Sequence, residues 1–273
     1  MSFRLPHDWI TPDWPAPPQV RALCTTRSGG VSAAPRDSLN LGFGVGDPPG
    51  AVRANWAAVQ ATLGSTVRPV RLHQVHGTDV LEVGRLSPDG QPADGCTTTE
   101  AGVACVALAA DCLPVLLTDR QGTRVAAVHA GWRGLAAGVL ESALACFPAE
   151  TRASQGDVAI KNEDAQADLL AWLGPCIGPG AFEVGPEVRE AFCTPDPGAA
   201  AHFTPGREGR FQADLAALAR RRLRAAGVTQ LYGNDSSPPW CTLENPSRFF
   251  SHRRDSAILG ATGRMAAAIW RVG

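Results

Sequence analysis

The alternation of apolar and polar positions predicts a chain in which β-strands alternate with helices. Two apolar runs, Leu113–Thr118 and Val125–Val128, have the length of buried strands, and the segment Asp119–Gly122 between them has the composition of a tight turn. After the second run, apolar positions recur with helical spacing from Trp132 to Phe147. The sequence therefore predicts a strand hairpin followed directly by a helix.

Further elements are predicted on both sides of this hairpin. Strands are expected at 20–26, 70–83 (a strand or hairpin arm), 97–108, 169–173, 229–232 and 248–255, and a strand or helix at 263–272. Helices are expected at 49–63, 185–193 and 212–226, and a mostly exposed insertion at 148–166. We predict an α+β (mixed α/β) fold: an irregular N-terminal arm, residues 1–18, and a single compact domain, residues 19–273, of mixed sheets flanked by helices.

The composition narrows the class of protein. The chain has 273 residues, of which 44% are hydrophobic and 19% charged, with a net charge of −1, so a large core is expected and a nucleic-acid partner is not. No run is long enough to span a membrane, and the N-terminus lacks the pattern of a signal peptide. The eight cysteines are scattered without a C-x-x-C pair. We therefore expect free thiols in a cytoplasmic protein. We also expect the protein to be a monomer.

The predicted hairpin brings two reactive side chains together. Cys112 precedes its first strand and His129 ends its second, so antiparallel pairing places both at the same end of a sheet. A neighbouring thiol and imidazole form either half of a metal site or a Cys/His catalytic pair. Asp111 is adjacent, and the glycine-rich start of the following helix, Gly131–Gly134, offers backbone donors that favour anions.

A second histidine would complete a metal site. His73 and His76 are three residues apart, so on a regular strand they face opposite sides, and one of the two is expected to be functional. Together with Cys112 and His129 this gives two nitrogens and one sulfur, a set that zinc accepts with a fourth position open. Divalent copper accepts it as well. Taken singly, each residue is more commonly a core thiol or a structural histidine.

The sequence resembles the YfiH family, also called the laccase-domain or multicopper polyphenol oxidase family and, in bacteria, the peptidoglycan editing factor. The matching motifs occur in family order and span Thr25 to Arg264. They are T-T-R-x-G-G-V-S from Thr25, S-L-N-L from Ser38, Q-V-H-G from Gln74, A-D-C-L-P from Ala110, H-A-G-W-R-G from His129, G-P-x-I-G-P from Gly174, F-E-V-G from Phe182, F-F-S-x-R-R-D from Phe249 and T-G-R from Thr262.

This resemblance implies a zinc site formed by His76, Cys112 and His129. It also implies phosphorolysis of purine nucleosides (adenosine, inosine, guanosine and methylthioadenosine) and deamination of adenosine, with a nucleoside and phosphate as the small-molecule partners. One position departs from the family pattern: Gly44 stands where a histidine often precedes V-G-D. If that histidine touches substrate, the preference of this chain differs.

Phosphorolysis requires a cationic cradle for phosphate and a proton for the departing base. Arg27, Arg133, Arg253 and Arg254, which lie at predicted turns, are the candidates for the cradle. Asp111 is the candidate proton donor, and its alternative role is to accept N–H groups at a turn. The glycine-rich loop at 38–46 lacks the Lys-Ser/Thr pair of a P-loop, so it is not a Walker site.

Three other functions use the same residues. A laccase requires many histidines, often as H-x-H, whereas this chain has six histidines and no such pair, so we predict one transition metal per chain. A Cys/His hydrolase, for instance one that edits peptidoglycan precursors, would use Cys112 as nucleophile and His129 as base. A non-enzymatic binding module would not depend on Cys112 at all.

Overall fold

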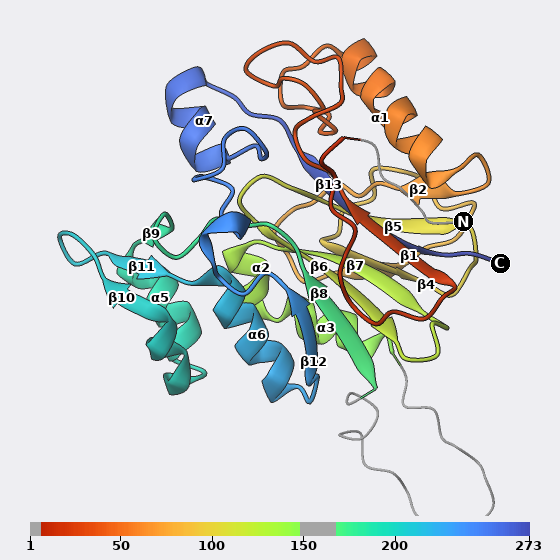
Figure 1. The fold of residues 1–273 in the computed structure, drawn as a ribbon. Helices are drawn as coiled ribbons and strands as arrows, with labels where there is room; N and C mark the ends of the chain where they lie inside the picture. Colours follow the sequence, from red (N-terminus) through yellow and green to blue (C-terminus); the bar gives the residue numbers. More distant parts are fainter. Residues whose placement is uncertain (1–6, 148–167) are drawn as a thin grey trace, which may run out of the picture.

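Two β-sheets lie face to face, and helices cover their outer sides (Figure 1). The computed structural model describes residues 7–147 and 168–273, so the predicted insertion at 148–166 lies outside the described residues. The predicted mixed α/β class is confirmed. Between residues 7 and 18 the chain runs without a helix or a full strand, although Ile10 bridges to Cys24 and Trp9 is buried.

The first sheet has four strands. Its order is β1 (Val20–Cys24), β13 (Met265–Arg271), β5 (Val103–Ala109) and β2 (Arg68–Val70). The β1–β13 and β13–β5 pairs are antiparallel and the β2–β5 pair is parallel. The two ends of the described chain therefore meet in one sheet, because β1 and β13 are neighbours.

The second sheet has six strands and carries the predicted hairpin. Its order is β12 (Gln230–Gly233), β8 (Leu169–Leu173), β6 (Leu113–Asp119), β7 (Val125–Ala130), β4 (Gly95–Thr98) and β3 (Val80–Glu82). The two edge pairs, β12–β8 and β3–β4, are parallel, and the inner pairs are antiparallel. A small third sheet joins β10 (Phe203–Pro205), β11 (Phe211–Ala213) and β9 (Glu183–Val184).

Helices bury the outer face of each large sheet. Helix α1 (Pro49–Leu63) packs on the four-stranded sheet through its apolar face. The six-stranded sheet is covered by α2 (Trp132–Ala137), α3 (Val139–Ala145) and α6 (Leu215–Ala225), and α5 (Pro186–Cys193) packs against α2 and the small third sheet. The remaining helical segments are α7 (His252–Leu259) and the short 3-10 turns η1 (Pro197–His202) and η2 (Pro238–Trp240).

Strand residues alternate between two apolar layers. On β6, Leu116 points between the sheets, whereas Val115 and Leu117 point toward the helices. On β13, Ile269 lies between the sheets and Ala268 faces the α1 side. Both faces of the central strands are thus buried, which explains why they are continuous apolar runs in the sequence. No helix within the described parts of the chain is long and apolar enough to cross a membrane.

Several predicted elements differ from the structure. The segment predicted as a strand or hairpin arm at 70–83 contains the end of β2 and all of β3, separated by an irregular loop. The strand predicted at 97–108 is β4 and β5 separated by a turn at Gly102. The helix predicted from Trp132 to Phe147 breaks at Gly138. The φ of Gly138 is 109°, a left-handed conformation that glycine adopts readily and other residues rarely do. Residues 248–255 are not a strand, because the Ser251 side chain caps the N-terminus of α7 by accepting from the N–H of Arg254.

We predict that Leu116→Ala lowers the free energy of unfolding by about 2–5 kcal/mol, because Leu116 is fully buried between the sheets. Leu86→Ala is the matched control, since Leu86 is 97% exposed and its truncation should change stability by no more than about 0.5 kcal/mol. Urea denaturation measures both. Equal stability of the two variants would show that the sheets do not share the described core.

Candidate functional site

The β6–β7 hairpin places Cys112 and His129 side by side. Its register pairs Leu113 with Ala130 and Pro114 with His129, so Cys112, directly before β6, lies beside the end of β7. This confirms the strand pairing expected from the sequence. His129 is buried, whereas Cys112 is partly accessible.

His76 reaches the same point from a loop rather than a strand. Its φ of 62° is in the left-handed region, which breaks the predicted strand at this residue. The carboxylate of buried Asp94 accepts the backbone N–H groups of Val75 (3.1 Å), His76 (3.0 Å) and Gly77 (2.6 Å). These three hydrogen bonds hold the loop in a tight turn, and the turn directs the His76 side chain toward Cys112.

The three predicted ligands converge. The candidate ligand atoms of His76, Cys112 and His129 all lie within 4.8 Å of one another, and the Sγ of Cys112 is 3.8 Å from the Nε2 of His76. Two imidazoles and one thiolate fit zinc or divalent copper. His73 is not part of this group, and its backbone forms an isolated β-bridge with Pro92. Gly131 makes room for the cluster, since a Cβ there would lie 2.7 Å from His76 Cδ2 and 3.2 Å from Cys112 Sγ.

Asp94 also orients His129. Its carboxylate is 2.8 Å from the Nδ1 of His129, so this nitrogen carries the shared proton and Nε2 is left to face the cluster. Burial by itself would raise the pKa of Asp94, but its hydrogen bonds to His129 and to the loop N–H groups lower it below its usual value. A carboxylate behind a metal-facing histidine is the usual arrangement in metal sites.

The cluster has an unusual charge state for a thiol and an imidazole. Burial would raise the pKa of Cys112, but the adjacent His129 charge and hydrogen bonds from both histidines lower it to about 6. Burial would lower the pKa of His129, but the Cys112 charge and the hydrogen bond to Asp94 raise it to about 9. Without a metal, the pair is therefore a thiolate beside an imidazolium at neutral pH.

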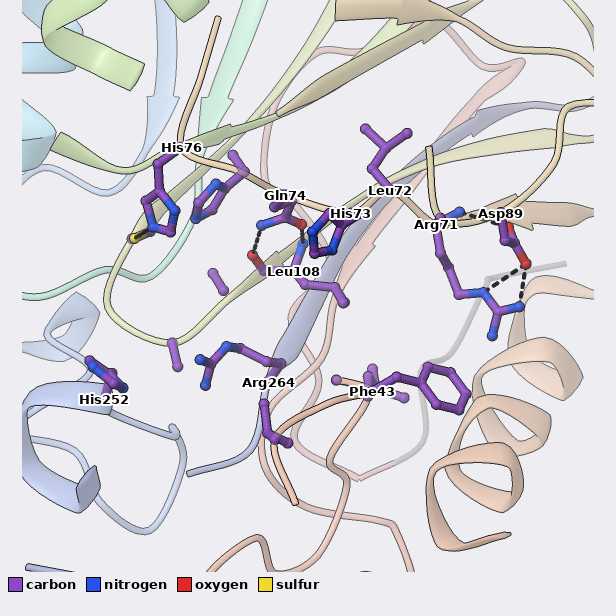
Figure 2. A pocket seen from close by; sticks show the side chains of 18 residues that line it. Phe43, Arg71, Leu72, His73, Gln74, His76, Asp89, Leu108, His252 and Arg264 are labelled. Atoms are coloured by element: carbon purple, nitrogen blue, oxygen red, sulfur yellow. Dashed lines mark hydrogen bonds and ion pairs between the residues drawn. The ribbon is translucent and has the colours of Figure 1, made fainter. Parts of the chain in front are cut away.

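A pocket of about 630 Å³ opens beside the cluster, which is large enough for a small-molecule ligand (Figure 2). Apolar side chains alternate with a few polar groups along its walls. Its lining comprises Leu41, Gly42, Phe43, Val45, Arg71, Leu72, His73, Gln74, His76, Asp89, Gly90, Leu108, Ala109, Ala110, Cys112, His129, His252 and Arg264.

Asp111 does not point into this pocket. Its carboxylate accepts hydrogen bonds from the hydroxyls of Thr242 and Ser251 and from the backbone N–H of Arg253 at 2.6 Å. Its φ of 88° turns the chain directly before Cys112. Asp111 is therefore an N–H and O–H acceptor that fixes the loop before α7 rather than a group that faces the pocket.

None of the four arginines predicted to bind phosphate lines the pocket. Arg27 forms an ion pair with Asp37 and stacks on Phe250, and Arg133 lies over Trp132. Arg253 and Arg254 donate hydrogen bonds to backbone carbonyls. Arg253 donates to Glu183, whereas Arg254 donates to Thr242, Leu243 and Phe249 and pairs with Asp255.

Sequence reasoning missed Asp94, Arg264 and the Arg71–Asp89 pair. Asp94 lies in an ordinary A-D-G turn, and only its position opposite His129 in the fold reveals its role. Arg264 belongs to the T-G-R motif, whose sequence alone does not indicate that the arginine lines the pocket. Arg71 and Asp89 come from different loops and meet only in the folded chain.

Comparisons with known proteins cover nearly the whole chain. A family model described as "Multi-copper polyphenol oxidoreductase laccase" matches residues 21–272. A purine nucleoside phosphorylase of Pseudomonas aeruginosa is 49% identical over 264 residues, which are 96% of this chain and 98% of that protein. The purine nucleoside phosphorylase YfiH of Escherichia coli is 45% identical over 263 residues, with the same coverage.

Solved structures agree with this relationship. A Neisseria meningitidis protein superposes with a TM-score of 0.85 at 46% identity, covering 98% of this chain and 100% of the other. YlmD from Geobacillus stearothermophilus superposes with a TM-score of 0.84 at 30% identity, covering 99% and 98%. The fold, the motifs and these relatives together show that the chain belongs to the laccase-like YfiH family.

Proposed function

We propose that this chain is a zinc-dependent purine nucleoside phosphorylase that accepts adenosine, inosine, guanosine and methylthioadenosine and also deaminates adenosine. The observation that carries the proposal is the His76–Cys112–His129 cluster at the wall of a pocket of nucleoside size. The names of the curated relatives support the same reaction class. The described cysteines are all free thiols, which supports a reducing, cytoplasmic setting.

The residues divide the task between binding and orientation. His76, Cys112 and His129 would hold the ion, and Asp94 keeps His129 in the tautomer that presents Nε2. When bound, the ion supplies Lewis acidity at the pocket wall and can lower the pKa of water enough for deamination. Apolar side chains such as Leu72 bind the nucleoside and exclude water from it.

A Cys/His hydrolase, such as one that edits peptidoglycan precursors, is the second candidate. The pKa of about 6 for Cys112 beside a protonated His129 favours it, because this is the charge state of a thiolate nucleophile. A multicopper oxidase has less support. Among residues 7–147 and 168–273 the His76–Cys112–His129 cluster is the single group with metal-ligand geometry, which accounts for one ion rather than several.

We predict that Cys112→Ala abolishes both zinc retention and phosphate-dependent release of hypoxanthine from inosine. The variant loses the one sulfur ligand, so both losses should occur together. Cys193→Ala, on α5, is the matched control and should keep zinc content and turnover. Metal analysis and a base-release assay with and without phosphate measure the effect. Activity that survives chelation but not thiol alkylation would instead establish the hydrolase.

We predict that Asp94→Asn weakens zinc binding about 10- to 100-fold, because the carboxylate orients His129 and holds the N–H groups of the His76 loop. The control is Asp13→Asn, an exposed change in the N-terminal segment. Competition against a chelator of known affinity measures both variants. Unchanged affinity in Asp94→Asn would mean that the carboxylate does not orient the cluster.

The charge state of the cluster predicts how zinc affinity depends on pH. Between about pH 6 and pH 9 the Cys112 thiol is already ionised, whereas His129 must release its proton to bind the metal. Affinity should therefore rise about tenfold per pH unit, with about one proton released per zinc. Calorimetry in buffers of different ionisation enthalpy counts this proton. No release at pH 7.5 would contradict the thiolate–imidazolium pair.

A further inference from the structure

The pocket contains two arginines, and only one has a carboxylate partner. Arg71 forms an ion pair with Asp89 on the pocket wall. The guanidinium of Arg264 forms no ion pair with any residue that the structure describes, and its single hydrogen bond is to the carbonyl of Gly263 at 3.1 Å. A half-buried cation that forms no ion pair is costly, so such a group in a ligand pocket indicates an anionic ligand.

Arg264 is held firmly by the glycine-rich loop at 38–46. The side-chain oxygen of fully buried Asn40 accepts the N–H of Arg264 at 2.9 Å, and the N–H of Leu41 donates to the Arg264 carbonyl at 3.0 Å. Gly42 leaves space for the arginine stem, since a Cβ there would lie 2.6 Å from Arg264 Cγ. The glycine-rich loop at 38–46 thus positions the Arg264 side chain.

The guanidinium faces the metal end of the pocket. In Figure 2 the Arg264 side chain extends toward the side on which His252 and His76 lie, away from Phe43. Arg264 and Cys112 line the same pocket. Burial lowers the pKa of Arg264, and the charges of Cys112 and Asp111 oppose this shift. The Nδ1 of His252 forms a hydrogen bond with the hydroxyl of Ser256, which fixes the orientation of the His252 ring at this end of the pocket.

We propose that Arg264 is the phosphate-binding residue of this pocket, and that Asn40 and Gly42 are positioning residues that act through it. The inference rests on the proposed phosphorylase function and deepens it. A planar guanidinium can hold two phosphate oxygens at once. It would orient a third oxygen for attack on the sugar.

The reaction balances without a further reactant. An oxygen of hydrogenphosphate forms a bond to C1′ of the nucleoside while the bond from C1′ to the base nitrogen breaks. The base leaves with that electron pair, and the proton of hydrogenphosphate ends on the base. The products are ribose 1-phosphate and the free purine, and Arg264 keeps its charge throughout.

The test measures KM for phosphate and for inosine separately in the zinc-loaded enzyme. Arg264→Gln should raise the phosphate KM by about 10- to 100-fold and leave the inosine KM within about twofold, because the charge and the paired donors of the guanidinium are lost. Arg264→Lys should raise the phosphate KM by less, since lysine keeps the positive charge but lacks the planar pair of guanidinium donors. Arg224→Gln, an exposed change on α6, is the matched control and should behave as wild type.

A second pair of variants leaves the charge in place and moves the side chain. Gly42→Ala adds a methyl group against the Arg264 stem and should raise the phosphate KM by about 3- to 10-fold. Gly50→Ala is its control, because a Cβ at Gly50 meets nothing within 4 Å. This pair decides the question if Arg264→Gln does not fold.

The two proposals fail in different ways. If wild-type enzyme shows no phosphate-dependent turnover, the phosphorylase proposal falls and this inference with it. If wild type saturates with phosphate and both Arg264→Gln and Gly42→Ala keep its phosphate KM, the enzyme is a phosphorylase but Arg264 does not bind phosphate. Protection of wild type against thermal unfolding by phosphate alone, lost in Arg264→Gln, would support the assignment without an activity assay.

Discussion

The candidate site depends on the hydrogen bonds that the carboxylate of Asp94 accepts. It accepts three successive N–H groups of the loop that carries His76 and, at the same time, the Nδ1 proton of His129. Because Asp94 is buried, these hydrogen bonds replace its lost hydration. One side chain therefore sets both the direction of one ligand and the tautomer of another, and Cys112 is placed independently by the β6–β7 hairpin.

The two large sheets contribute different halves of the pocket. The six-stranded sheet supplies the hairpin that carries Cys112 and His129, whereas the four-stranded sheet supplies Arg264 directly before β13. Close backbone approach is needed on both sides, and glycine provides it at Gly131 and at Gly42. The apolar layer between the sheets thus also fixes how the His76–Cys112–His129 cluster and the Arg264 guanidinium are placed relative to each other.

The elements that could be predicted from the sequence are those that the local pattern of apolar residues determines. Two apolar runs with a tight turn gave the hairpin, and with it the proximity of Cys112 and His129. The family motif selected His76 over His73, although spacing along a strand did not. The loop around His76 was predicted as a strand because its shape comes from Asp94, which is distant in sequence. Arg264, the proposed phosphate-binding residue, was also missed, since turn arginines are common and only the fold shows which of them lines the pocket.

The central claim is that two imidazoles and one thiolate converge on one divalent ion. X-ray absorption at the zinc edge of the zinc-loaded protein tests this claim directly. We predict one sulfur neighbour at about 2.3 Å and two nitrogen neighbours at about 2.0 Å. A spectrum of the wild-type protein with no sulfur neighbour would contradict the account.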